Sequence, residues 1–405
     1  MKTSLSTVKQ PKKYDFVLLG IIITMAITSI VAIYSTFELL PAHVSGPDLI
    51  FKQVLWYAIG FAGIAAIMFI GNEGIYDLAK IVYWILIGAL LLLVLNQIVN
   101  MIFGNNTNLP FIHETNGATS WFYLPFGSLQ PSEFMKVDLI VLTAGLISKH
   151  HKEYYEASYE NDVILFVSIL KYALPALFLI YIQPDTGICL IIIVSLSIMI
   201  MCSGIKPGWI IGAFVAVGII LGIFFFFFFF YNDQLMRFFG GSYKLNRIVG
   251  WIYPEQNLIG AGQQLYTALL AIGSAGLFGY GMKTKVVTLL EPQTDFIFAV
   301  FSQSFGLIGS LFIIALCVLL DWRLFKIAIQ SKVSFEKYIV CGILGMLLFQ
   351  QIENIGMVIG LLPITGVTLP FISYGGSSLL SYLLALGIVM NTSSQAKKLS
   401  DYVYK

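Results

Sequence analysis

The chain has 405 residues, of which 58% are hydrophobic and only 11% are charged. A soluble domain carries about 25% charged residues, so this composition excludes a soluble globular protein and predicts an all-α polytopic membrane protein. The formal net charge is only +2, and this near balance argues against a nucleic-acid partner.

Ten apolar segments are long enough to cross a bilayer, which takes roughly 20 residues. The first follows a lysine-rich start and lacks a cleavage site of small residues, so we expect a retained helix and not a removed signal peptide. The predicted spans are, in chain order, 16–36, 53–71, 79–102, 132–148, 162–181, 187–203, 208–230, 294–320, 337–361 and 373–392.

The basic residues orient these spans, because Lys and Arg are enriched in cytoplasmic loops. Lysines precede the first span and follow the fourth, the sixth and the tenth, and the connection 321–337 is also basic. With ten spans, all of these segments fall on one side of the membrane. Both termini are therefore predicted to be cytoplasmic.

Two connections on the other side are long, at about 103–131 and 231–293. Only the second is large enough for a structure of its own, so we expect one transmembrane domain, 1–405, with a large extracellular loop at 231–293. That loop carries five basic residues, Arg237, Lys244, Arg247, Lys283 and Lys285. They predict a basic lining for an anionic ligand at the outer face, and contact with lipid headgroups is the alternative.

Polar groups interrupt several spans, and such groups are functional candidates by default in a membrane. Glu133 and Lys136 are three residues apart, so they share a helix face and can pair. The ninth span contains Gln350, Gln351, Glu353 and Asn354. By topology, Lys52, Glu133, Asp185, Asp295 and the stretch 362–378 all lie toward the outer face. Their convergence predicts a polar cavity that opens outward, whereas each one alone would be explained by a contact between helices.

Asp295 stands where the long external loop ends and the eighth span begins. Steps of three and four place it on one helix face with Ala299, Ser302, Gly306 and Gly309. Small residues let helices approach closely in a bilayer, so the carboxylate is predicted to face the interior of the bundle. The alternative is a helix N-cap, a position that Asp and Thr both favour.

Motifs in a fixed order along most of the chain resemble the SEDS family, the RodA, FtsW and SpoVE peptidoglycan polymerases. The most specific are Asn354 followed by LLPITG at 361–366 and LPFISYGGSS at 369–378. The others are KQ at 52–53, GATSW at 117–121, QPSEFMK at 130–136, QPD at 183–185, IGAG at 259–262, AIGSAGLFG at 271–279 and TDFIF at 294–298. The regions 259–279 and 354–370 resemble RodA most. The chain departs from the family pattern at Ser120, Ser128 and Gln293.

The resemblance implies a glycosyltransferase that polymerises lipid II into glycan strands at the outer face of the bacterial cytoplasmic membrane, for cell elongation and shape. The donor would be a growing polyprenyl-diphosphate-linked glycan, and lipid II would be the acceptor. Asp295 would be the catalytic carboxylate. The implied substrate-binding residues are Lys52, Gln130, Glu133, Lys136, Asp185, Arg247, Glu291, Thr294, Asn354, Ser373, Gly375 and Gly376.

The resemblance also implies a class B penicillin-binding protein, a single-pass transpeptidase, as the partner. We expect its span to pack against the eighth or ninth span of this chain. A divalent cation, Mg²⁺ or Mn²⁺, would help to neutralise the leaving diphosphate, but no ligand motif identifies a site for it.

Two other functions fit a polar cavity in a polytopic bundle. The first is a flippase or transporter of lipid II, which ranks second because the sequence has no ATP-binding motif and no clear inverted repeat. The second is a noncatalytic scaffold for division or elongation. The retention of Asp295, Glu133 and Lys136 argues against a scaffold.

Overall fold

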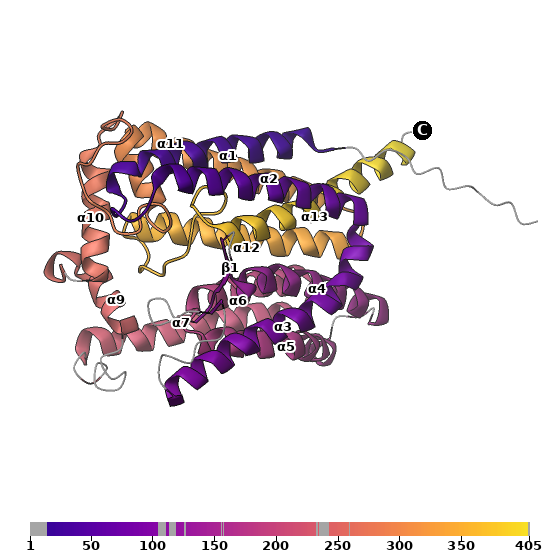
Figure 1. Cartoon of the computed structure of the whole chain (residues 1–405). Helices are drawn as coiled ribbons and strands as arrows, with labels where there is room; N and C mark the ends of the chain where they lie inside the picture. The colour runs from indigo at the N-terminus through magenta and orange to yellow at the C-terminus, as the bar shows by residue number, and fades with distance from the viewer. Residues whose placement is uncertain are drawn as a thin grey trace, which may run out of the picture.

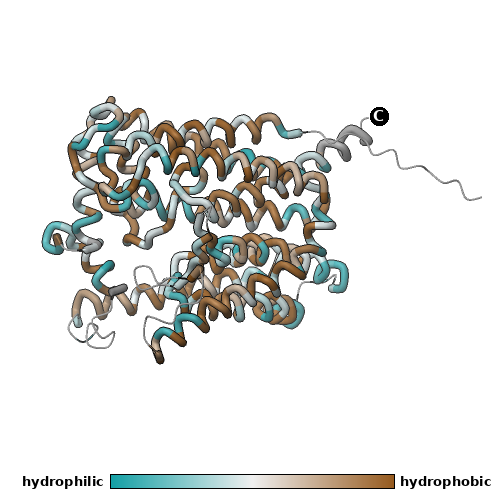
Figure 2. The backbone as a smooth tube through the Cα atoms, viewed as in Figure 1, coloured by the Kyte–Doolittle hydropathy of each residue, from teal (hydrophilic) through white to brown (hydrophobic). Residues whose placement is uncertain are grey.

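A computed structural model describes residues 14–103, 111–112, 119–124, 127–154, 156, 158–231, 234, 243–258 and 260–403. The described chain is a bundle of long helices that lie side by side, with two shorter helices, α9 and α10, across one end (Figure 1). Apolar residues run along the helices, and polar residues gather at the helix ends and in the connections (Figure 2). This distribution is the one expected for a protein that spans a membrane.

Each of the ten predicted spans coincides with a helix. These helices are α1 (Phe16–Ser35), α2 (Gly46–Ile70), α3 (Asn72–Phe103), α4 (Pro131–Glu153), α5 (Tyr159–Ile182), α6 (Thr186–Cys202), α7 (Pro207–Phe230), α11 (Ile297–Gln330), α12 (Ser334–Val358) and α13 (Gly376–Val403). Eight helices of the described chain are long and apolar enough to cross a membrane by themselves. The all-α polytopic fold is confirmed, and the number of ten crossings stays a prediction.

The helix boundaries differ from the predicted spans where polar residues meet helix ends. Helix α2 begins at Gly46, seven residues before the predicted start at 53, because Pro47 suits a first turn and the polar residues after it continue the helix. Helix α11 begins only at Ile297, and its N-cap position is Phe296. Asp295 therefore lies in the preceding turn, so both the predicted helix face and the N-cap alternative are wrong for this residue.

Both long connections contain structure of their own, so the expectation that only the second is large enough for one is wrong. The first holds an antiparallel pair, β1 (Phe122–Leu124) and β2 (Gly127–Leu129), in which Phe122 pairs with Leu129. The second holds α9 (Tyr243–Ile252), the short 3-10 helix η2 (Pro254–Gln256) and α10 (Ala261–Ser274). A further 3-10 turn, η1 (Phe37–Leu39), follows α1.

Helix α11 is broken at Gly306, which has a φ of 64°. The glycine-rich loop after α10 lies against this break: Leu307 N donates to Gly276 O at 2.9 Å, and Tyr280 N donates to Gln303 O at 3.0 Å. A Cβ at position 306 would stand 2.5 Å from backbone atoms of Leu277. Glycine permits this close backbone approach, and the break explains why the small-residue face predicted along α11 is interrupted.

Helix α7 lies at the edge of the bundle and is exposed along almost its whole length. Phe228 is its one buried residue, and it packs against Leu245 of α9. The phenylalanine run 224–230 is thus mostly on the surface, where lipid would cover it. This arrangement agrees with a space-filling role for most of the run.

Candidate active site

The connection between α12 and α13, residues 359–375, is held in place by α1 and α2. Ser29 Oγ donates to Ile372 O at 2.8 Å, and Tyr57 OH donates to Phe371 O. Gln53 Nε2 donates to Ser29 Oγ at 3.0 Å and to Ser373 O at 3.3 Å. Functional loops need such rigid support, and here it comes from buried side chains of two helices.

The turn that carries Asp295 lies against this connection. Ser373 Oγ donates to Thr294 O at 2.7 Å, and Tyr374 N donates to Gln293 O at 2.9 Å. Asn354 of α12 is fully buried, and its Nδ2 donates both to Asp295 O and to Val367 O, each at 2.8 Å. The backbone of Asp295 is therefore fixed between α12 and the connection.

The carboxylate of Asp295 is partly buried and faces Gly366, where a Cβ would stand 3.4 Å from Asp295 Oδ2. Burial raises the pKa of Asp295 to about 6; the charge of Glu291 also raises it, while Arg247 and a hydrogen bond from Thr294 lower it. A carboxyl with a pKa near neutrality is a better general base than an ordinary aspartate. The turn thus holds a carboxylate suited to accept a proton.

Helix α9 brings the basic group to this carboxylate. Arg247 Nη1 donates to Thr365 O at 3.1 Å, and Trp251 Nε1 donates to Gly360 O at 2.9 Å, so α9 is docked on the α12–α13 connection. Lys283 lies elsewhere, with its Nζ 4.3 Å from the centre of the Tyr34 ring. The predicted basic lining is therefore represented next to Asp295 by Arg247, while Arg237 and the side chain of Lys244 lie outside the described residues.

A second polar cluster lies where the first turns of α4 contact α13. Lys136 Nζ is 2.5 Å from Glu133 Oε2, and the exposed fractions of the two side chains are 0% and 8%. Ser381 Oγ donates to Glu133 Oε2 at 3.4 Å, and Lys136 Nζ lies 4.3 Å from the centre of the Tyr382 ring. The pairing expected from the three-residue spacing is present, and it is buried.

Asp185 joins this second cluster. Gln130 Nε2 donates to Asp185 Oδ2 at 2.6 Å, and Ser132 Oγ donates to the same oxygen at 3.2 Å. Asp185 Oδ1 accepts from Ile188 N at 3.2 Å and so caps α6. Both carboxylate oxygens are bound within the protein, which favours a positioning role for Asp185 over direct contact with a substrate.

The structure thus divides the predicted site residues into two groups and a rim. We call Asp295, Glu291, Thr294, Arg247, Asn354 and Ser373 the Asp295 cluster, and Gln130, Glu133, Lys136 and Asp185 the Lys136 cluster. The ring of Phe371, in the α12–α13 connection, lies 5.5 Å from the ring of Tyr382, which contacts Lys136.

The remaining predicted residues lie at the rim, that is, outside both clusters; they are Lys52, Gly375 and Gly376. Lys52 pairs with Asp48 at 2.7 Å and is half-exposed, whereas its buried neighbour Gln53, which accepts from Gly375 N, contacts the connection. A Cβ on Gly376 would stand 2.6 Å from the Trp56 ring.

Comparison with known proteins places this chain in a family. A family model described as "Cell cycle protein", for FtsW, RodA and SpoVE, matches residues 12–398. The chain belongs to the FtsW/RodA/SpoVE family. The family membership expected from the motifs is confirmed.

Curated relatives of several kinds match most of the chain. Stage V sporulation protein E of Bacillus subtilis is 36% identical over 289 residues, which cover 70% of this chain and 73% of the relative. The probable peptidoglycan glycosyltransferase FtsW of Trichlorobacter lovleyi is 31% identical over 398 residues, 95% of this chain and 94% of the relative. The peptidoglycan glycosyltransferase MrdB of Escherichia coli K12 is 33% identical over 293 residues, 71% of this chain and 74% of the relative.

Two solved structures share the fold of this FtsW/RodA/SpoVE family member. A chain from a peptidoglycan synthase complex has a TM-score of 0.69 at 22% identity, over 95% of this chain and 98% of its own length. The rod shape determining protein RodA of Thermus thermophilus has a TM-score of 0.61 at 24% identity, over 94% and 96%. Relatives of all three kinds match, so the particular likeness to RodA stays a prediction.

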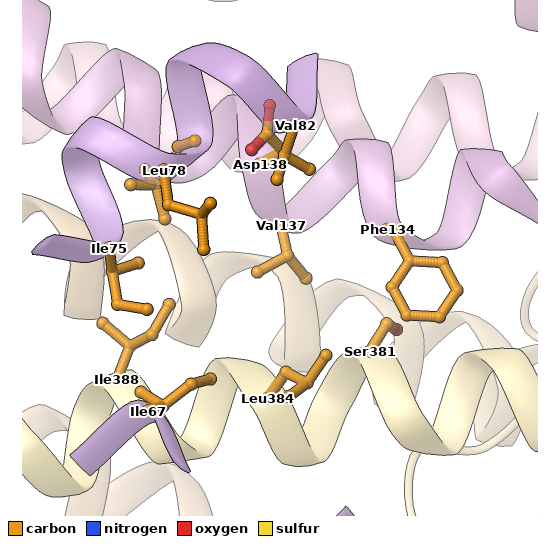
Figure 3. A pocket seen from close by; sticks show the side chains of 12 residues that line it. Ile67, Ile75, Leu78, Val82, Phe134, Val137, Asp138, Ser381, Leu384 and Ile388 are labelled. Carbon is orange, nitrogen blue, oxygen red and sulfur yellow. The ribbon is translucent and has the colours of Figure 1, made fainter. Parts of the chain in front are cut away.

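A cavity of about 130 Å³ lies between α2, α3, α4 and α13, and it borders the Lys136 cluster through Ser381, the residue that donates to Glu133 Oε2 (Figure 3). Its lining is apolar except for Asp138 and Ser381, and it includes none of the predicted site residues. Asp138 is a buried carboxylate that was not predicted as a candidate, although an acidic residue well inside a predicted span was the available signal.

The described residues contain no group of three or more His, Cys, Asp or Glu side chains that could hold a metal ion. Mg²⁺, however, is usually bound by one or two carboxylates together with substrate phosphates. The exposed carboxylate of Glu291, whose charge acts on Asp295, meets this smaller requirement. The donor set therefore fits a cation that arrives with a diphosphate.

Proposed function

We propose that this protein polymerises lipid II into glycan strands at the outer face of the bacterial cytoplasmic membrane, with Asp295 as the general base. Relatives over most of the chain are named peptidoglycan glycosyltransferases, so the reaction class is peptidoglycan glycosyl transfer. The observation that carries the role of Asp295 is its setting: a partly buried carboxylate with a raised pKa, beside Arg247 and facing Gly366.

The reaction joins two sugars. The hydroxyl of the lipid II acceptor attacks the anomeric carbon of the donor, a carbon–oxygen bond forms, and the bond to the polyprenyl diphosphate breaks with its electrons leaving on the phosphate oxygen. Asp295 takes the proton that the hydroxyl loses, a contribution of about 10²–10⁴-fold to the rate for a positioned base. Gly366 leaves the space in front of the carboxylate free of a side chain.

The leaving diphosphate is strongly negative and needs compensating charge. Arg247, fixed by its bond to Thr365 O, is the cation of the Asp295 cluster. A divalent cation, Mg²⁺ or Mn²⁺, held by Glu291 together with phosphate oxygens, would add charge neutralisation at the same place. The polyprenyl chains need an apolar surface, and the exposed helices supply one.

The second part of the proposal concerns assembly and orientation. The fold matches a chain of a peptidoglycan synthase complex, which supports a class B penicillin-binding protein as the partner. We place both termini and the α11–α12 turn in the cytoplasm, with α9 and α10 outside. The lipid II flippase is not favoured, because the named activity of the relatives is glycosyl transfer.

The decisive experiment measures glycan polymer made from lipid II by the purified protein, with and without a transpeptidase partner. Asp295→Asn keeps the size of the side chain and removes the base, so we expect at least about a hundredfold lower rate with unchanged yield. The matched control is Asp77→Asn, an exposed carboxylate in α3, which should behave as wild type. An Asp295→Asn protein that polymerises within a few-fold of wild type would refute the assignment, and movement of lipid II across vesicles without polymer would favour the flippase.

A further inference from the structure

Glu353 is a buried carboxylate that the proposed chemistry does not use. It lies in α12 directly before Asn354, and only 4% of its surface is exposed. A carboxylate inside a membrane span is costly, so its presence calls for a specific partner. That partner is Thr365 of the α12–α13 connection, whose Oγ1 donates to Glu353 Oε1 at 2.9 Å.

Thr365 is next in the chain to the residue that faces Asp295, and it also binds Arg247, so it relates two of the charged groups of the Asp295 cluster. Its carbonyl oxygen accepts the hydrogen bond from Arg247 Nη1 at 3.1 Å. The next residue, Gly366, turns the backbone with a φ of 81° and faces Asp295 Oδ2. A shift of Thr365 would therefore move two groups at once: the carbonyl oxygen that binds Arg247, and the Gly366 backbone that faces the Asp295 carboxylate.

Two successive residues of α12 hold the segment 365–367 from both sides of Gly366. Glu353 binds the side chain of Thr365, and Asn354 binds Val367 O as well as Asp295 O. One turn of a rigid helix thus sets the relative positions of the base, the arginine anchor and the glycine between them. Catalytic geometry of this kind depends on supporting hydrogen bonds.

We propose that Glu353 is a positioning residue of the glycosyltransferase site: through Thr365 it fixes Gly366 and the anchor of Arg247 relative to Asp295. This inference rests on the proposed function. It predicts that the hydrogen bond, and not the charge of Glu353, is what catalysis needs, because Oε1 acts as an acceptor.

The test compares kcat and KM for lipid II polymerisation in purified variants. Glu353→Val and Thr365→Val each remove one side of the bond, and each should lower kcat by roughly tenfold to a hundredfold with little change in KM, since misplacement by about 1 Å costs about this much. Glu353→Gln and Thr365→Ser keep the acceptor and the donor, so both should recover most of the lost rate. The double variant Glu353→Val with Thr365→Val should be no slower than either single variant.

The matched control is Gln351→Leu. Gln351 is also buried in α12, but its Nε2 donates to Asp321 Oδ1 of α11 at 3.3 Å and has no bond to the Asp295 cluster. Its loss should lower the melting temperature and leave the kcat of folded protein near wild type.

Four results would overturn the positioning role. If Glu353→Val is fully active while Asp295→Asn is inactive, Glu353 has no positioning role, and the proposed function still stands. Equal inactivity of Glu353→Gln and Glu353→Val would mean that the carboxylate itself is required. If Gln351→Leu lowers kcat as much as Glu353→Val does, general destabilisation explains the loss of rate in both variants. Additive losses in the double variant would show that the two side chains act independently. An inactive wild type, by contrast, would contradict the proposed function itself.

Discussion

At the scale of residues, three aspartates stand next to helix starts and serve different purposes. Asp15 and Asp185 accept from the backbone N–H of Leu18 and Ile188 and cap α1 and α6. Asp295 lies one residue before the N-cap position of α11, and no side-chain cap bond is formed there. Its carboxylate is left to face Gly366 and the neighbouring charges, so one residue type next to a helix start supplies a cap in two places and the proposed base in the third.

The raised pKa of Asp295 predicts the pH dependence of polymerisation. The base form is the deprotonated carboxylate, and a pKa of about 6 means that kcat should be nearly constant above pH 7 and fall about tenfold per unit well below pH 6. Glu291→Gln removes a charge that raises this pKa, so its acid limb should move to lower pH. Initial rates between pH 4.5 and 8 measure both effects. A limb that moves to higher pH in Glu291→Gln, or a flat wild-type profile down to pH 5, would contradict Asp295 as the base.

The pair Glu133–Lys136 predicts a sharp effect on stability. Removing one partner leaves the other charge buried without compensation, at a cost of about 3–5 kcal/mol. Glu133→Gln and Lys136→Met should each lower the yield and the melting temperature of the purified protein. The double variant carries neither charge, so it should be more stable than either single one. Two single variants with wild-type melting temperature and activity would show that the pair is dispensable.

At the scale of elements, the site is assembled from connections that rigid helices hold. The α12–α13 connection is bound by Ser29, Gln53 and Tyr57 on one side and by Asn354 on the other. The 276–281 loop is bound where α11 is broken at Gly306. Loops fixed in this way can place catalytic groups with the accuracy of the helices that bind them.

The exposed side of α11 predicts where the transpeptidase span packs. Helix α12 is largely buried, with Ile352 as an exception, whereas α11 exposes an apolar side that includes Leu307, Leu311 and Val318. We therefore expect contact through α11, and less through α12 than the sequence indicated. Leu311→Trp should lose co-purification with a class B penicillin-binding protein while the chain still folds, and Ile81→Trp on the exposed side of α3 is the control. Equal co-purification of both variants would reject this placement.

At the scale of the whole molecule, the sequence predicts the parts of the fold that follow from a strong local signal. Apolar stretches predict all ten long helices, and the spacing of Glu133 and Lys136 predicts their contact. Composition cannot show that Asp295 precedes its helix, because the helix start depends on how the 291–296 turn binds the α12–α13 connection. Nor can composition show which of the neighbours Lys52 and Gln53 points inward, because the packing of α2 on α13 decides this.

Long-range contacts also explain why the role proposed for Glu353 could not be predicted from the sequence. Glu353 was visible as a polar residue in a span, but its partner Thr365 depends on how the connection folds back on α12. The opposite end of the bundle shows the same effect. Asp15 binds Arg323 at 2.5 Å and Ser393 at 2.6 Å, so the start of α1 meets parts of α11 and α13 there.

That meeting point makes the orientation testable with two cysteine probes. Asp15, Arg323 and Ser393 place the start of α1 and parts of α11 and α13 at one end of the bundle, while α9 and α10 lie across the other end (Figure 1). The basic-residue pattern assigns the first end to the cytoplasm. In a cysteine-free background, Gln256→Cys beside α9 should react with a membrane-impermeant thiol reagent on intact cells, and Lys332→Cys between α11 and α12 should react only after the membrane is opened. Both positions are exposed, so access to the reagent depends on the side of the membrane. The reverse labelling pattern would invert the topology and would place Asp295 on the side opposite to its proposed substrate.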